Sequence, residues 1–462
     1  MKYFTKDLRE PQAGVIFPRE GSEASVSGVP NHYSGAFPFH FPIMATEKHN
    51  PWLHRLAIFA VLCTLILIGL VGLVTSREAG LAVPDWPTSF GYNMFLFPLD
   101  QWLGKFGIFE EHSHRLMASL VGLLTAALAG WLWVRESTGR ARTFAFGGII
   151  ITLGLMGVRT QAMFVGMAFL AAMVAAVSIF KICKDRRALR WWGTLAYSLL
   201  IVQGVLGGLR VTELADQIGI FHGTLAQVFL LVLASLALFN SRWWKRIRAA
   251  ATQKELVPRV VRSHFFYATL LIFLQLIIGA TMRHQHAGLP VWDFPKAHGQ
   301  WWPATDEASI ANYNANRTTL QTSLHADNRI FDAEGNPTVF LSTGNPISKQ
   351  HISMHMVHRV MAVLILGMVL GTVILAHRKL GAGHVLSRLS LGWLGLILAQ
   401  VTLGAFTVLK YKPADIATLH VVCGALALGT GVMGALISRN KVLPSLLGTS
   451  VSKTEHSMEA AA

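Results

Sequence analysis

Ten long apolar segments constrain this chain more than any other feature of its sequence. Most are about 20 residues long and nearly free of charge, which is the length that an α-helix needs to cross about 30 Å of hydrocarbon. With 52% hydrophobic and only 14% charged residues among 462, the composition is not that of an ordinary soluble domain. The predicted spans are 53–74, 113–134, 143–158, 163–182, 190–211, 219–240, 264–283, 352–376, 386–409 and 417–438. The sequence therefore predicts an all-α integral membrane protein with about ten transmembrane helices.

Lys and Arg residues cluster in four short loops between these segments, near 135–142, 184–190, 242–262 and 378–388. With ten helices, all four loops fall on one side of the membrane, and the bias of basic residues toward cytoplasmic loops makes that side cytoplasmic. Both termini are then cytoplasmic, and two long loops, near 75–112 and 284–351, lie outside. Because the net charge of +16 forms no single basic patch or stripe, we expect no nucleic-acid partner.

The first 50 residues lack the apolar stretch of a secretory signal, so the first span is expected to direct insertion. They also contain Asp7, Glu10, Glu20 and Glu23, whereas transit peptides are poor in acidic residues. We therefore predict a multi-pass protein of the bacterial inner (plasma) membrane.

The sequence also repeats itself. The loop Gly80–Pro87 (GLAVPDWP) follows the first span, and Gly288–Pro295 (GLPVWDFP) follows the seventh. Each loop leads into a helix with a His-Arg pair. The last two helices of each half are one with a Gln-x-x-x-Gly motif and one with a histidine near its start. The repeated residues are His114-Arg115 and His358-Arg359, Gln203 to Gly207 and Gln400 to Gly404, and His222 and His420. A duplicated unit of four helices explains this order.

The repeat divides the chain into two pseudo-symmetric four-helix halves, and the first half carries an extra hairpin between its two histidines. The predicted parts are a cytoplasmic tail at 1–50, a first half at 51–245 with the inserted hairpin at about 143–182, a basic cytoplasmic linker at 246–262, a second half at 263–440 with a long outer loop at about 284–351, and a C-terminal tail at 441–462. Neither insertion displaces the repeated histidines.

Four histidines lie at similar depth near the outer ends of predicted helices: His114 and His222 in the first half, His358 and His420 in the second. A single histidine in a membrane helix could be hydrogen-bonded to a neighbouring helix, but four at repeated positions favour a function. Haem iron takes two axial imidazoles from facing helices. Zinc or copper would need further ligands, and none recurs in both halves. The sequence therefore predicts two bis-histidine haem sites.

The two predicted sites differ at one position. Glu111 lies one helical turn before His114, and the matching residue of the second half is His355. A carboxyl group beside an apolar haem pocket could act as a general acid or base. The alternative is a glutamate that is favoured only by the dipole at a helix start.

Other polar residues near these sites allow more than one interpretation. Arg115 and Arg359 could bind haem propionates or extend to the outer interface. His351, His355 and His358 share a helical face, and the repeat selects His358 as the ligand. Five further histidines are predicted to lie solvated in outer loops: His112, His284, His286, His298 and His325.

At these residues the chain resembles the haem A synthase family, over roughly residues 53–440. The motifs that carry the resemblance are Glu-x-x-His-Arg at Glu111 to Arg115, the loop Gly80–Pro87, the His-Arg pair at His358, and the paired His222 and His420. The resemblance implies an oxidoreductase that converts the C8 methyl group of haem O to a formyl group, giving haem A for terminal oxidases. It also implies a role for each site residue: Glu111 as the catalytic carboxylate, His114 and His222 as axial ligands of the substrate haem, and His358 and His420 as iron ligands of a haem b cofactor.

The resemblance further implies partners: haem O and haem A, haem O synthase, terminal oxidase assembly proteins, an electron acceptor that the sequence does not identify, and the lipid bilayer. A homo-oligomer is compatible with the sequence. The chain departs from the family's eight-helix pattern by the extra hairpin and the long polar stretch at 296–350. It also lacks the outer cysteine pair of some members, because Cys63, Cys183 and Cys423 lie in or beside apolar segments.

Two other functions would use the same four histidines. One is a non-catalytic dihaem b-type electron-transfer cytochrome, and the other is a haem transporter or chaperone. Neither needs a carboxylate in only one half, so Glu111 favours the enzyme.

Overall fold

The computed structural model describes the chain from residue 49 to residue 439, with short gaps. The described ranges are 49–77, 79–80, 82–155, 161–213, 215–249, 257–285, 289–326 and 346–439, without the side chains of residues 161, 248–249 and 318–326. The predicted tails therefore lie almost entirely outside the described residues. Within these ranges the chain is all-helical, as predicted.

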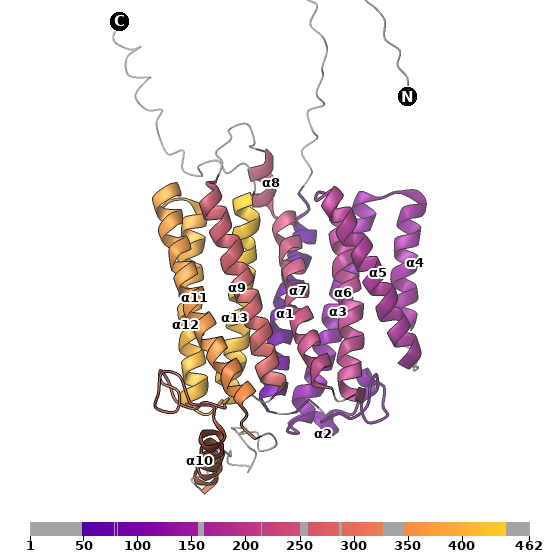
Figure 1. Cartoon of the computed structure of the whole chain (residues 1–462). Helices are drawn as coiled ribbons and strands as arrows, with labels where there is room; N and C mark the ends of the chain where they lie inside the picture. Colours follow the sequence, from indigo (N-terminus) through magenta and orange to yellow (C-terminus); the bar gives the residue numbers. More distant parts are fainter. Residues whose placement is uncertain are drawn as a thin grey trace, which may run out of the picture. The chain divides into compact units, whose positions relative to one another are not determined.

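Every predicted span contains a helix. The long helices are α1 (Pro51–Ser76), α3 (Ile108–Glu136), α4 (Gly139–Leu155), α5 (Gln161–Lys184), α6 (Leu189–Glu213), α7 (Asp216–Asn240), α9 (Arg259–His284), α11 (Lys349–Leu380), α12 (Val385–Leu409) and α13 (Ala414–Arg439). In the described part of the chain, nine of them are long and apolar enough to cross a membrane. The tenth, α4, has 17 residues and packs on α3 at the edge of the bundle (Figure 1).

The long helices form two groups of four. In the first group, α1 packs on α3 and α7, and α6 packs on the same two helices. The second group repeats this arrangement, with α9 and α12 each packed on α11 and α13. The groups meet where α1 packs on α13 and α7 packs on α9, while α4 and α5 lie outside the first group (Figure 1). The fold is therefore two four-helix halves with two added helices, of which α4 packs on α3 and α5 packs on α6.

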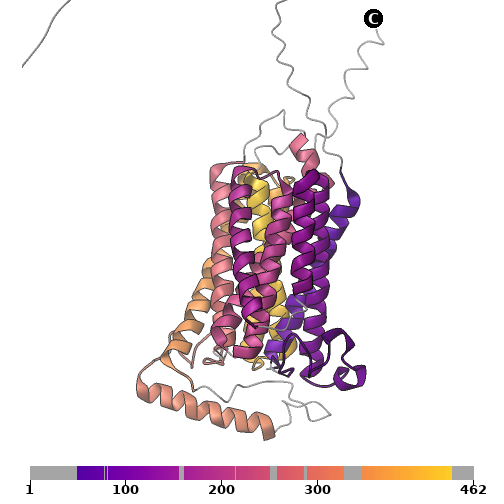
Figure 2. The ribbon, with the colours of Figure 1, turned by 90° about the vertical axis from the view of Figure 1, so that its right-hand side faces the viewer.

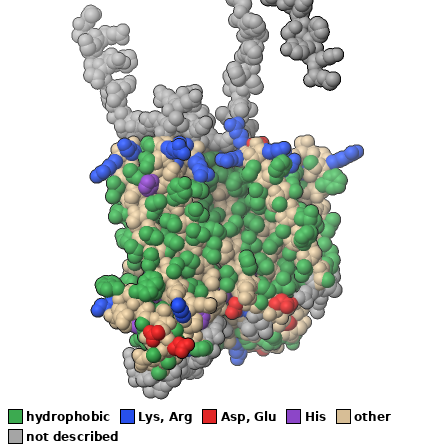
Figure 3. Space-filling view, viewed as in Figure 1, with side chains coloured by type: hydrophobic (Ala, Val, Ile, Leu, Met, Phe, Trp, Pro, Cys, Tyr) green, Lys and Arg blue, Asp and Glu red, His purple; other side chains and the backbone are tan. Residues whose placement is uncertain are grey.

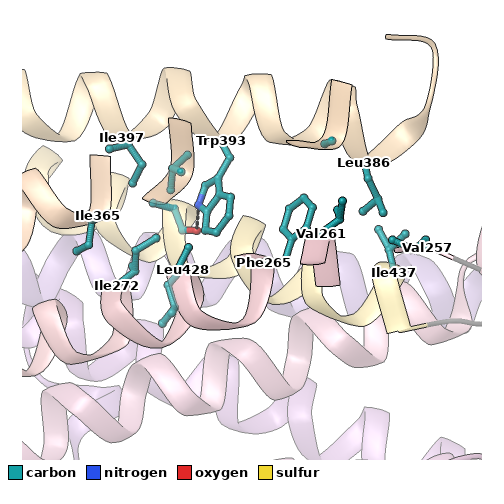
Figure 4. Packing of buried hydrophobic residues seen from close by; sticks show 14 of the residues in the cluster. Val257, Val261, Phe265, Ile272, Ile365, Leu386, Trp393, Ile397, Leu428 and Ile437 are labelled. Carbon is teal, nitrogen blue, oxygen red and sulfur yellow. Dashed lines mark hydrogen bonds between the residues drawn. The ribbon is translucent and has the colours of Figure 1, made fainter. Parts of the chain in front are cut away.

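Aromatic packing fixes the second group near its centre. The rings of Phe265 on α9 and Trp393 on α12 are parallel within 4°, with centroids 5.6 Å apart (Figure 4). The indole nitrogen of Trp393 donates a hydrogen bond of 2.8 Å to the carbonyl of Ala427 on α13. Because the ring is fully buried, this bond satisfies its one polar atom and ties three helices together.

The two ends of the bundle differ in charge. On the face that Figure 3 shows, apolar side chains cover a broad band, and Lys and Arg side chains gather at the end that carries α8 (Arg242–Ala249). We call this the basic end. The opposite end carries the loops that follow α1 and α9, and we call it the loop end. This distribution agrees with the predicted orientation, in which the basic end faces the cytoplasm.

The loop end contains two helices that hydropathy did not predict, α2 (Leu99–Trp102) and α10 (Glu307–Ala326). Helix α10 lies across the loop end of the second group (Figure 2). It is anchored by Asn314, whose side chain accepts a 2.8 Å hydrogen bond from the amide of Ile347 and donates one of 3.1 Å to its carbonyl. The predicted connection at 284–351 therefore contains a helix, which a search for apolar segments misses because α10 is polar.

Candidate functional site

The repeated loops of the sequence fold alike. In the first, the Asp85 carboxylate accepts hydrogen bonds from the amides five and six residues later, at 2.6 and 2.8 Å. In the second, Asp293 accepts the equivalent bonds at 2.7 and 2.9 Å. Both loops have a cis bond before the proline of the motif. Burial raises the pKa of Asp85, but the bonds from the Thr88 hydroxyl and the two amides outweigh it and hold this pKa below its usual value.

An arginine fastens each loop to the helix that follows it. Arg115 donates to three loop carbonyls at 2.6, 2.8 and 2.9 Å, including that of Asp85. Arg359 donates to two carbonyls of its own loop at 2.7 and 2.9 Å, including that of Asp293. Both arginines therefore hold a loop. Their contact with haem propionates stays a prediction.

Glu111 is buried at the start of α3, with 4% of its surface exposed. Its Oε1 lies 2.6 Å from Arg115 Nη2, and its Oε2 accepts a 2.9 Å hydrogen bond from the amide of Val83. The neighbouring Glu110 accepts a 2.7 Å bond from the amide of Gly107 and so caps the helix. Glu110 thus caps the helix, while Glu111, which also lies in its first turn, is bonded to the loop and to Arg115.

The second loop keeps its fold without a carboxylate on the helix. His355 stands at the position of Glu111 and is equally buried, at 4% exposed. Asp293 nevertheless accepts the same two amide bonds as Asp85, and Arg359 donates to two of the three equivalent carbonyls. Loop folding thus does not require an acid at this position, which leaves the carboxylate of the first half available for another role.

The four predicted haem ligands lie near the loop end in two pairs. His114 is the seventh residue of α3 and His222 the seventh of α7. Their imidazoles are near enough to interact electrostatically. The imidazoles of His358 on α11 and His420 on α13 interact in the same way. The structure therefore brings together the two histidines of each half, as the repeat predicted.

A glycine lies against one imidazole of each pair. A Cβ placed on Gly207 of α6 would lie 3.1 Å from Cε1 of His222, and a Cβ on Gly404 of α12 would lie 3.1 Å from Cε1 of His420. Carbon atoms in contact settle at about 3.5–4.0 Å, so any side chain at these positions would displace the ring. This close approach explains the glycine of each Gln-x-x-x-Gly motif.

The glutamine of each motif contacts the same histidine. Gln203 Nε2 donates a 2.8 Å hydrogen bond to the backbone carbonyl of His222. Gln400 Nε2 lies 3.1 Å from Nε2 of His420. Glutamine and glycine of the motif therefore position one histidine of each half from the adjacent helix.

All four imidazoles fit an iron-bound ligand. Each has a buried Nδ1 without a hydrogen-bond partner among the described residues. A buried polar atom left unpaired costs about 1–3 kcal/mol, so these nitrogens are open to a bonding partner from outside the protein, as is the Nδ1 of His355. Within the described residues no group of three or more His, Cys, Asp or Glu side chains is arranged for a metal ion. Each pair offers two protein ligands, which is the number that a bis-histidine haem takes.

His112, which was assigned to the outer loops, is a buried residue of α3. Helix α3 begins at Ile108, five residues before the predicted start, and so includes His112, which is 1% exposed. Its Nδ1 lies 3.2 Å from the Ser89 hydroxyl, and its ring contacts Phe97 and Trp102 with centroids 5.2 and 4.7 Å away. The prediction of a solvated His112 is therefore wrong, and this residue fastens the first loop to α3.

The other histidines of that group differ. His284 is the last residue of α9 and lies against Gly219 of α7. His298 is a loop residue but half-buried, and its ring is stacked on Tyr313 with centroids 3.7 Å apart. Burial lowers the pKa of His298. His286 and the side chain of His325 lie outside the description.

Sequence reasoning missed several residues that contact the four histidines. Gln275 on α9 donates a 2.9 Å hydrogen bond to the carbonyl of His358. Arg210 at the end of α6 interacts electrostatically with His222, and Arg283 at the end of α9 with His420. The sequence feature that could have identified them is a polar or charged residue inside or at the edge of an apolar segment, because such a residue needs a partner in the membrane.

Comparisons with known proteins point in one direction. The sequence profile of a family described as cytochrome oxidase assembly protein matches residues 150–432. A haem A synthase from Beijerinckia indica is 24% identical over 411 residues, which covers 82% of this chain and 90% of the relative. A haem A synthase from Shouchella clausii is 23% identical over 256 residues (54% and 65%), and one from Rhizorhabdus wittichii is 22% identical over 288 residues (61% and 74%).

Proposed function

Because the chain belongs to the haem A synthase family of cytochrome oxidase assembly proteins, we propose that it is an oxidoreductase that oxidises the C8 methyl group of haem O to the formyl group of haem A. Conversion of a methyl to a formyl group (R–CH3 + H2O → R–CHO + 4 H⁺ + 4 e⁻) needs water as the source of oxygen, an electron acceptor and a group that takes up protons. The proposal is supported by two bis-histidine pairs and by one buried carboxylate that occurs in only one of them.

The single observation that carries the proposal is the position of Glu111. It lies one turn from His114, is held by Arg115 and the amide of Val83, and has no counterpart in the second half. Both carboxylate oxygens are fixed, which keeps the group in place for proton transfer at the first pair. Glu111 is therefore assigned as the catalytic carboxylate, with His114 and His222 as ligands of the substrate haem.

The second pair is assigned to the cofactor. His358 and His420 would hold a haem b, whose iron supplies one-electron redox chemistry when it is bound. The glycine against His420 and the glutamines beside both residues orient the imidazoles before any haem arrives. Such preorganisation lowers the cost of binding in both halves, so the cofactor is assigned to the second pair because that pair lacks a carboxylate.

The setting follows from the same proposal. The chain would lie in a bacterial inner membrane with the loop end outside, receive its substrate from haem O synthase, and supply terminal oxidase assembly. In this assignment Arg115 and Arg359 hold the loops that lie beside the two sites.

The experiment is expression in a host that supplies haem O, followed by extraction, chromatography and mass measurement of membrane haems. Cells without the chain are the control. Haem A that appears only with the chain is the expected result. Bound haem b with no haem A would overturn the proposal and indicate a dihaem electron-transfer cytochrome, and reversible binding of haem O without product would indicate a carrier.

A further inference from the structure

The strongest unassigned feature is a pair of arginines beside the histidine pairs. A haem carries two propionate carboxylates, and charges placed within a membrane need partners. Arg115 and Arg359 already donate to loop carbonyls, and Arg115 is neutralised by Glu111. Both arginines are therefore engaged by the loops, and other cations beside the histidine pairs are better placed to bind propionates.

Arg283 lies beside the second pair. Its guanidinium donates through Nη2 to the carbonyl of Gly72 and, at 2.5 Å, to the hydroxyl of Ser76, both on α1. A Cβ on Gly72 would lie 3.1 Å from the side chain of Thr418, two residues before His420 on α13. Gly72 and Thr418 are thus at the same depth, closer to the loop end than His420. The guanidinium, which is bonded to Gly72 and Ser76, therefore lies on the loop-end side of the imidazole, where a carboxylate of the bound group would leave the apolar pocket.

The side chain of Arg283 has donors to spare. Its Nε is buried and has no hydrogen-bond partner in the described part of the chain. It forms no ion pair with a described carboxylate, yet its charge reaches His420. A guanidinium with an unused edge is suited to a carboxylate, which it binds through two parallel hydrogen bonds.

Arg210 of α6 lies beside the first histidine pair. It lies one turn after Gly207, the residue in contact with His222. Its Nε would be 3.1 Å from a Cβ placed on Gly219, which lies one turn before His222. The guanidinium therefore also lies on the loop-end side of its imidazole, and no described carboxylate pairs with it.

We propose that Arg283 and Arg210 bind the propionate carboxylates of the haems in the second and first sites. The inference rests on the assignment of both histidine pairs as haem sites and not on the reaction performed there. The two arginines come from helices that are not equivalent in the repeat, α9 and α6, so the propionates of the two haems are held differently.

The test compares haem b with its propionate dimethyl ester, which has the same ring but no carboxylates. Apoprotein in detergent is titrated with each compound, and binding is followed by the low-spin absorption of the bis-histidine complex. A background of His222→Ala isolates the second site, and His420→Ala isolates the first. We expect the free acid to bind about tenfold more tightly than the ester, which is the value of a charge-assisted contact.

Arg283→Gln should abolish this preference at the second site and Arg210→Gln at the first, while ester binding stays unchanged. The matched control is Lys410→Gln, which removes an exposed cation at the loop end of the second half. An unchanged preference in Arg283→Gln overturns the proposal, as does loss of the preference in Arg359→Gln instead. A parallel fall in ester affinity would show that the arginine is structural. Haem A formation does not enter this test, so it can succeed or fail independently of the proposed reaction.

Discussion

Replacement of Gly404 by alanine should displace His420 without unfolding the protein. The added methyl carbon would lie 3.1 Å from Cε1 of the imidazole, against about 3.5–4.0 Å for carbon atoms in contact. The ring must therefore move by about half an ångström, whereas ligand distances at a metal tolerate only about 0.2 Å. We expect Gly404→Ala to lose most of the low-spin haem of the second site.

The matched substitutions make this prediction specific. Gly207→Ala should disturb His222 in the same way and affect only the first site. Gly392→Ala on α12 is the control, because nothing lies within 4 Å of its added Cβ, and alanine stabilises a helix by up to about 1 kcal/mol relative to glycine. The assay is the haem-to-protein ratio and low-spin spectrum of each purified variant. Full haem content in Gly404→Ala would refute the reasoning. Loss of the haem of one and the same site in both Gly404→Ala and Gly207→Ala would also refute it.

Two further predictions concern the first loop. His112→Met leaves the buried Ser89 hydroxyl unpaired and should lower the free energy of unfolding by about 1–3 kcal/mol. The second half has Met356 and Ala297 at these two positions, so adding Ser89→Ala should restore part of the lost stability. Unfolding of the variants in detergent measures both effects. The lowered pKa of Asp85 means that its bonds stabilise the loop above the ordinary pKa of about 4 and are lost as the pH falls through the folded value. Amide exchange of the loop, corrected for its intrinsic rate, should therefore rise in acid in the wild type but stay constant in Asp85→Asn. A wild-type loop with no such rise would contradict this account.

The sequence predicted the parts of the fold that depend on hydropathy and order. Every span was found because its burial in lipid demands an apolar stretch, and the pairing of histidines followed from the repeat. Helix α10 was missed because its residues are polar and it is stabilised by contacts of Tyr313 and Asn314 with other segments. Such contacts leave no periodic pattern.

The site was predicted as a set of residues but not as a set of bonds. Sequence alone paired Glu111 with His114, but it could not show that Arg115 is occupied by loop carbonyls or that His112 is enclosed by aromatic rings. The sequence could not identify Arg283 as a site residue, because its position beside His420 depends on how α9 packs against α1 and α13. These features require the packing of helices that are far apart in sequence.

The central claim is tested most directly by haem chromatography of Glu111→Gln and Glu110→Gln in a host that supplies haem O. Glutamine at 111 can still accept the bond from Val83, so the protein should fold and keep its haem. Loss of an acid–base group lowers a rate by about 10²–10⁴-fold. The account predicts that Glu111→Gln retains bound haem and loses haem A, while Glu110→Gln, which alters only the helix cap and its ion pair with Arg77, still produces it. Haem A at the wild-type level in Glu111→Gln would contradict the assignment.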